Sequence, residues 1–112
     1  MYFAASILGK SQYAAVGEEV RLRCTPTTNA TVNWYYKPSL DVGDQEIAAS
    51  GNLLNGNNER YDYDGTNLSI KNATQNDSGF YICVENDGFG DRHTIELTVI
   101  GICHLRHFVV RA

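Results

Sequence analysis

The chain's only tryptophan, Trp34, lies between two cysteines, Cys24 and Cys83, and this arrangement constrains the fold more than any other feature. The second cysteine ends the segment DSGFYIC at 77–83, in which Tyr81 precedes it by two residues. Around all of these residues, apolar and polar side chains alternate, as they do in strands that bury one face. The pattern predicts that these residues stand in strands of a β structure.

With 112 residues, the chain has the length of one ordinary domain. Alternating segments recur along it, and turn residues such as Asp64-Gly65 separate them. We expect strands within residues 20–24, 32–37, 60–63, 68–70, 81–83 and 95–99, with a short edge strand at 45–50. Several short strands at this spacing predict an all-β sandwich.

Charge and motifs exclude several classes of function. The chain carries 9 basic and 13 acidic residues with the signs mixed, which disfavours nucleic-acid binding. His93, His104 and His107 have no nucleophile motif nearby, and no GxSxG, HExxH or glycine-rich phosphate loop occurs. We therefore expect no enzyme, no cofactor and no metal site. The apolar start at 1–8 lacks the basic residues of a signal peptide, and no apolar run is long enough to span a membrane.

Residues 9–101 resemble a domain of the immunoglobulin superfamily. The motifs that carry the resemblance are GEEVRLRC at 17–24, VNWY at 32–35, RY at 60–61, NLSI at 67–70 and DSGFYIC at 77–83. They are similar to strands B to F of that family. The resemblance implies an immunoglobulin-like sandwich of two antiparallel sheets with Greek-key connections. It leaves 1–8 as an N-terminal flank and 102–112 as a C-terminal tail or linker.

Two types within the superfamily stay open. The cysteine spacing is similar to that of the I-set, but the segment 39–58 follows no I-set pattern and leaves room for the extra edge strand of a variable-type domain. An antigen-receptor variable domain is disfavoured, because the loop after Cys83 is short.

The resemblance implies a disulfide between Cys24 and Cys83, with Trp34 packed against it. In the chain-entropy model, a loop of this length is worth roughly 4 kcal/mol of stability. Such a bond persists in an oxidising compartment, so the pair favours a place outside the cell. Reduced core cysteines, as in cytosolic members of the fold, are the alternative.

The resemblance also assigns structural roles to three further residues. Tyr81 is expected to donate its hydroxyl to the backbone near Asp77, which forms a tyrosine corner. Arg60 is expected to pair with Asp77 across the bottom of the sandwich. If that pair is partly buried, the loss of one partner leaves an uncompensated charge. We interpret all three residues as structural.

The alternation also predicts a surface for partners. If the tryptophan and the second cysteine face inward, their neighbours in the sequence must face outward. These neighbours are Asn33, Tyr35 and Lys37 on one strand, and Ile82 and Val84 on another. The resemblance implies that the two strands lie side by side in one sheet. We expect them to form an exposed apolar patch with a polar rim, which is typical of protein contacts. Scattered apolar surface residues are the alternative.

Four N-x-[ST] sequons occur, at Asn29, Asn67, Asn72 and Asn76. They favour N-glycosylation of a protein of the secretory pathway, with polar turns as the alternative. The sequon of Asn76 is the least favoured of the four, because it contains the corner residue Asp77. Glycans at Asn67 and Asn72 would shield the sheet that holds strand E and would direct partners to the opposite sheet.

Together these features favour an extracellular protein-recognition module of a cell-adhesion or receptor ectodomain. Its expected partner is another protein or an identical domain, bound through the sheet that contains strands G, F and C. The alternative is an intracellular structural I-set domain of a muscle or cytoskeletal protein. Recognition of sialic acid is disfavoured, because no arginine stands at the outward positions 80, 82 and 84.

Cys103 lies after the last expected strand, beside His104 and His107. It could form an intermolecular disulfide. A zinc site is disfavoured, because this spacing matches no recognised finger. We interpret the segment as a linker or tail.

Overall fold

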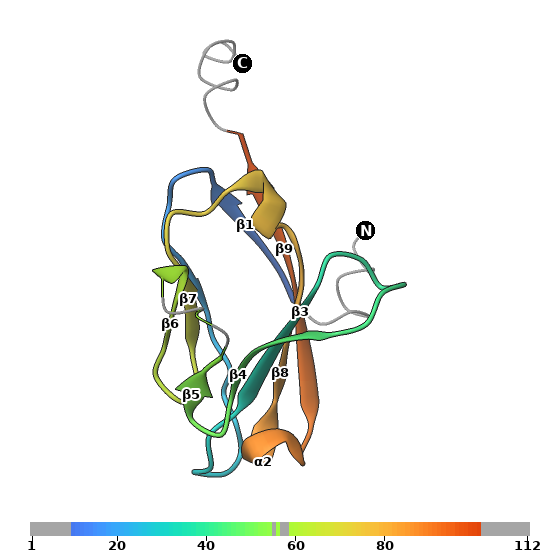
Figure 1. The fold of residues 1–112 in the computed structure, drawn as a ribbon. Helices are drawn as coiled ribbons and strands as arrows, with labels where there is room; N and C mark the ends of the chain where they lie inside the picture. Colours follow the sequence, from blue (N-terminus) through green and yellow to red (C-terminus); the bar gives the residue numbers. More distant parts are fainter. Residues whose placement is uncertain (1–9, 55, 57–58, 102–112) are drawn as a thin grey trace.

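The computed structural model describes residues 10–101 except 55, 57 and 58, and these residues form two facing β-sheets (Figure 1). One sheet has six strands in the order β1-β9-β8-β3-β4-β5, and the other has three in the order β2-β7-β6. The predicted all-β sandwich is confirmed. The flank at 1–8 and the tail at 102–112, which includes Cys103, lie outside the described residues.

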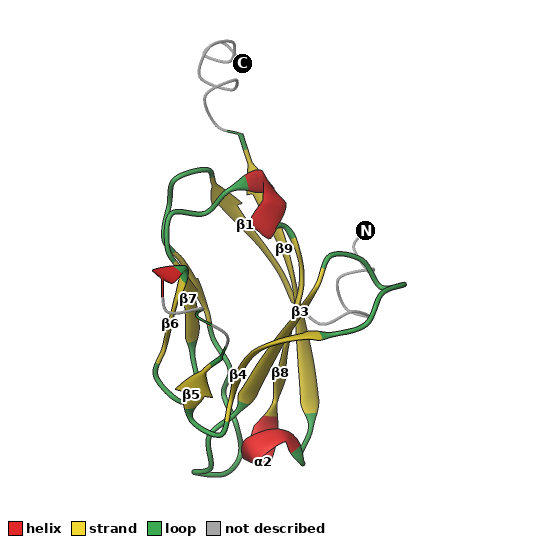
Figure 2. Cartoon of the chain, viewed as in Figure 1, coloured by secondary structure: helices red, strands yellow, loops and turns green. Residues whose placement is uncertain are grey.

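Most of the described chain is strand or loop, with little helix (Figure 2). The strands are β1 (Lys10–Ala15), β2 (Val20–Leu22), β3 (Asn33–Lys37), β4 (Gln45–Ala49), β5 (Asn52–Leu53), β6 (Tyr61–Tyr63), β7 (Leu68–Ile70), β8 (Gly79–Val84) and β9 (Arg92–Ile100). In the sequence, the short helical turn η2 (Gln75–Asp77) precedes β8, and the short helical turn α2 (Glu85–Gly88) follows it.

The six-stranded sheet is wider than the sequence predicted. β1 pairs with β9 in parallel, with Tyr13 beside Thr98, and the alternation did not reveal this strand. β4 forms close to the expected place, but it is not an edge strand, because β5 pairs with its far side. β4 also carries a bulge: Ala48 pairs with Trp34, whereas Tyr35 pairs with Glu46. The extra residue in a bulge bends a strand and increases its twist.

The core lies between the two sheets and contains the predicted sulfur bridge. A disulfide joins Cys24, just after β2, to Cys83 on β8, with 6.3 Å between their Cα atoms. Trp34 is fully buried, and its Nε1 donates a hydrogen bond of 2.9 Å to the carbonyl oxygen of Thr66. This bond satisfies the one polar group of the indole, so that the ring can be buried without an unpaired donor. The disulfide prediction is confirmed.

One end of the sandwich is closed around Asp77. Tyr81 is buried, and its hydroxyl donates a hydrogen bond of 2.6 Å to the carbonyl oxygen of Asp77. The carboxylate of Asp77 is itself buried and forms an ion pair with Arg60. The hydrogen bond from Arg60 to the Asp77 carboxylate raises the pKa of the Arg60 guanidinium. Burial raises the pKa of the Tyr81 hydroxyl. These are the contacts expected of the three residues.

The tyrosine corner gives a test of this packing. We expect Tyr81→Phe to lower the free energy of unfolding by about 1–3 kcal/mol, because the Asp77 carbonyl loses its buried donor. Tyr13→Phe is the matched control, since the ring of Tyr13 is exposed. Urea denaturation measures both variants, and equal stabilities for the two would contradict the role of the buried hydroxyl.

Candidate protein-binding face

The outward face of the six-stranded sheet follows from the register of its central strands. Trp34 lies opposite Cys83, so their neighbours turn away from the core. Tyr35 of β3 lies opposite Ile82 of β8, which in turn lies opposite Thr94 of β9. The pairing of β3 with β8 therefore places the predicted partner residues on two neighbouring strands.

The predicted exposure of this patch is wrong for three of its five residues. Ile82, Val84 and Asn33 are only 2%, 5% and 7% exposed, although they face away from the core. Tyr35 and Lys37 are half-buried. Loops that the sequence did not place must therefore cover part of the sheet.

The first cover is a charged bridge formed by the loop before β4. Asp44 accepts from two cations: Lys37 of β3 with an Nζ–Oδ1 distance of 3.3 Å, and Arg92 of β9 with an Nη2–Oδ2 distance of 3.4 Å. Because β8 lies between β3 and β9, the bridge spans the outward face of β8, where Ile82 stands. The bridge thus joins the two strands on either side of the one that carries Ile82, a side chain that alternation assigns to the outside.

The second cover is the turn α2, which folds back over the other end of the face. Asn86 and Asp87 have left-handed backbone conformations, with φ of 53° and 57°. Gly88 also has a positive φ, and a Cβ there would lie 2.5 Å from the side-chain nitrogen of Asn33. Only glycine fits so close to that amide. The turn thus packs against Asn33, which lies opposite Val84 in the sheet.

Aromatic side chains remain accessible around these covers. Tyr35 and Phe80 are half-buried on the outward face. Phe89, at the tip of the turn, is 88% exposed, and Asp87 and Asp91 flank it in the sequence. The sequence analysis did not single out Phe89. An aromatic residue within a glycine-rich, acidic turn was the available signal, because such turns lie on the surface.

A buried carboxylate anchors this turn. Glu85 is 3% exposed, and its Oε1 accepts hydrogen bonds of 2.9 Å from both the amide and the hydroxyl of Thr27. Its Oε2 lies 2.6 Å from Nε2 of His93. The hydrogen bonds from Thr27 and His93 lower the pKa of the Glu85 carboxyl. No pattern in the sequence predicts this cluster, because Thr27 and Glu85 are far apart along the chain.

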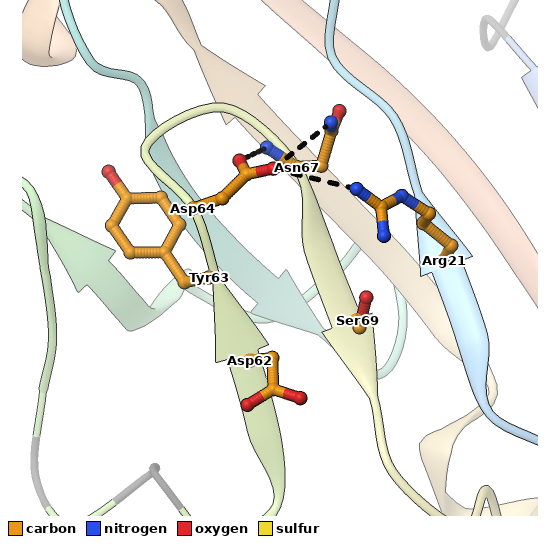
Figure 3. Close-up of a pocket in the computed structure, with 6 residues that line it drawn as sticks. All are labelled: Arg21, Asp62, Tyr63, Asp64, Asn67 and Ser69. Carbon is orange, nitrogen blue, oxygen red and sulfur yellow. Dashed lines mark hydrogen bonds and ion pairs between the residues drawn. The ribbon is translucent and has the colours of Figure 1, made fainter.

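The outward face of the three-stranded sheet carries mostly polar and charged side chains. A small depression of about 180 Å³ lies there, and its lining is polar (Figure 3). The lining residues are Arg21, Asp62, Tyr63, Asp64, Asn67 and Ser69. Arg21 pairs with Asp64 at 3.5 Å, and Asp64 also accepts from the backbone amide of Asn67, which lowers the pKa of its carboxyl. The charges are thus satisfied within the chain.

Two other features, a metal-binding cluster and a membrane-spanning helix, are absent from the described part of the chain. Among those residues, no group of three or more histidine, cysteine, aspartate or glutamate side chains is placed to hold a metal ion. Within the same residues, no helix has the length and apolar character needed to cross a membrane.

The comparisons with known proteins decide the family. The model of the immunoglobulin V-set domain matches residues 10–100. The chain belongs to the immunoglobulin V-set family. Variable-type domains add two edge strands beside strand C, as β4 and β5 do here, so the type that the sequence left open is the variable one. No curated protein sequence matches this V-set chain.

Solved structures share the fold of this V-set domain. The ZIG-8 IG1 homodimer structure superposes with a TM-score of 0.66 at 18% identity, covering 83% of this chain and 80% of that one. The first Ig domain of the mouse polymeric immunoglobulin receptor gives 0.65 at 18% identity, covering 84% and 92%. Dscam1 isoform 7.44, in a structure of its four N-terminal Ig domains, gives 0.62 at 25% identity, covering 82% of this chain and 22% of that one.

The lowered pKa of Glu85 predicts an acid-sensitive contribution to stability. Such a carboxylate stabilises the fold above its unfolded pKa, 4.5 for glutamate, and this contribution disappears as the pH falls through the folded pKa. We expect Glu85→Gln to be less stable than the native chain above pH 4.5, with a difference that shrinks below it. Urea denaturation across this range measures the difference, with Glu96→Gln as the control. A difference independent of pH would contradict the assignment.

Proposed function

We propose that this V-set domain is an extracellular protein-recognition module of a cell-adhesion molecule or receptor, and that it binds another protein through the outward face of its six-stranded sheet. The supporting observation is the distribution of aromatic side chains. Tyr35 and Phe80 are half-buried on that face, and Phe89 is exposed at its end. The outward positions of β2, β6 and β7 instead carry Arg21, Asp62 and Ser69.

An apolar centre within a polar rim is the usual anatomy of a protein contact. Here the Lys37–Asp44–Arg92 bridge crosses the face, and Glu46 and Glu96 add charge on β4 and β9 beside the aromatic residues. Aromatic rings supply large contact areas and lose little conformational freedom on binding. The charges around them would set the orientation of the partner and its rate of association more than its affinity.

The compartment and the first partner to test follow from separate observations. The disulfide is consistent with an oxidising compartment such as the cell exterior. An identical domain is the first partner to test, because the ZIG-8 domain of the same fold was solved as a homodimer. A reduced and unglycosylated product from secretory cells would instead favour the intracellular alternative.

Binding through this face can be tested with charged substitutions. We expect the double variant Tyr35→Asp and Phe80→Asp to abolish self-association or partner binding without unfolding, because both side chains are partly accessible. Ile82 is unsuitable for this purpose, since a charge at a buried site would destabilise the fold. Arg23→Glu adds acidic charge beside the opposite sheet and is the control. Sedimentation velocity over a range of concentrations measures association, and unchanged association in the double variant would refute the proposed face.

Glycosylation at the sequons is part of the same proposal. Asn29, Asn72 and Asn76 are exposed. The side chain of Asn67 is half-buried: its Oδ1 accepts from the Cys24 amide at 3.2 Å, and its Nδ2 donates to Asp64 at 3.4 Å.

We therefore expect glycans at the three exposed sequons and none at Asn67, whose acceptor nitrogen is already bonded. Mass spectrometry of glycopeptides from protein made in eukaryotic secretory cells gives the occupancy of each site. Full occupancy at Asn67, or no glycan at any site, would contradict the expectation.

A further inference from the structure

We propose that Glu85 is a positioning residue, which joins the loop at 25–31 and the turn at 85–91 into one rigid unit and so presents Phe89 in a single orientation. We call these two segments together the apex. They are far apart in the sequence and are connected to different strands, so that without cross-links each would be free to move separately.

The first cross-link is the Glu85 carboxylate itself. It receives the Thr27 amide, the Thr27 hydroxyl and His93 Nε2, at 2.9, 2.9 and 2.6 Å. One carboxylate thus holds the loop, the turn and the first residues of β9. Hydrogen bonds to an ionised acceptor are about twice as strong as neutral ones. Because the carboxylate is buried, water competes poorly for these bonds.

A second cross-link lies nearer the tip. The Asp87 amide donates to the Thr31 carbonyl oxygen at 2.7 Å, and the Thr31 hydroxyl donates to the Asp87 carboxylate at 3.1 Å. The base of the turn is closed by the backbone of Glu85, which donates to Asp91 at 2.9 Å and accepts from Gly90 at 2.8 Å. Phe89 therefore lies between two points that are fixed to the rest of the apex.

The hydrogens in this cluster can be assigned by chemistry. An ionised carboxylate only accepts, so Nε2 of His93 must carry a hydrogen and donate it to Glu85. The other charged groups near this contact are Asp87 and Asp91 in the turn, and Arg92, which is paired with Asp44. The bonded Nε2 hydrogen is a direct spectroscopic signature of the cluster.

The benefit of this rigidity rests on the proposed function: a loop that is ordered before binding loses less entropy when a partner arrives. The rigidity itself is a property of the free domain. Its test therefore needs no partner, and a failure of the binding experiment with Tyr35 and Phe80 would leave it unaffected.

Amide hydrogen exchange of the free domain at neutral pH, followed by NMR, tests the coupling. In the native chain we expect slow exchange at Thr27, Asp87 and Gly90. Glu85→Gln should speed exchange at all three amides by about tenfold or more, and by more than at the amides of β3 and β8, whose exchange rises only with the loss of global stability. It should also remove the hydrogen-bonded signal of His93 Nε2.

The decisive variant lies on the far side of the cross-link. Thr27→Val removes one donor to Glu85, and we expect it to speed exchange in the turn, at Asp87 and Gly90. Thr25→Val replaces another exposed threonine of the same loop, is the matched control, and should leave the turn unchanged. If Glu85→Gln fails to fold, the comparison of Thr27→Val with Thr25→Val still tests the coupling between the loop and the turn. Faster exchange confined to the mutated loop, or fast exchange at Thr27 in the native chain, would overturn the proposal.

Discussion

The pairing of Trp34 on β3 with Cys83 on β8 determines which side chains of the central strands face the core and which face outward. It places the indole and the disulfide between the sheets, and the period of a strand then assigns each neighbouring residue to the inside or the outside. A slip by one residue would exchange the two faces. The burial of Trp34 and the bond to Cys24 make such a slip costly, because it would expose the largest side chain of the core.

An outward direction is not the same as exposure, and this difference shapes the candidate site. Ile82 and Val84 face away from the core, yet they are buried, and the Asp44 bridge and the turn α2 lie at the same face. The covers leave the face with separate accessible aromatic side chains in place of one apolar strip. Such a surface can stay soluble while it keeps side chains that provide most of the contact energy in protein interfaces.

Sequence patterns predicted the features whose causes are local or are carried by a motif. The disulfide between Cys24 and Cys83 and the inward direction of Trp34 follow from alternation and from the family resemblance. The Glu85 cluster could not be predicted from the sequence, because its contact with Thr27 joins two loops and depends on the backbone paths of both. The same holds for the parallel strand β1, the pairing of β4 with β5, and the loop that carries Asp44, each of which depends on contacts distant in the sequence.

The central claim, that register sorts the aromatic residues into a buried set and an accessible set, can be measured directly by hydroxyl-radical footprinting with mass spectrometry. The account predicts rapid oxidation of Phe89, intermediate oxidation of Tyr35, and protection of Trp34 and Tyr81, although indole is intrinsically the most reactive of these rings. Oxidation of Trp34 or Tyr81 as fast as that of Phe89 in the folded domain would contradict it.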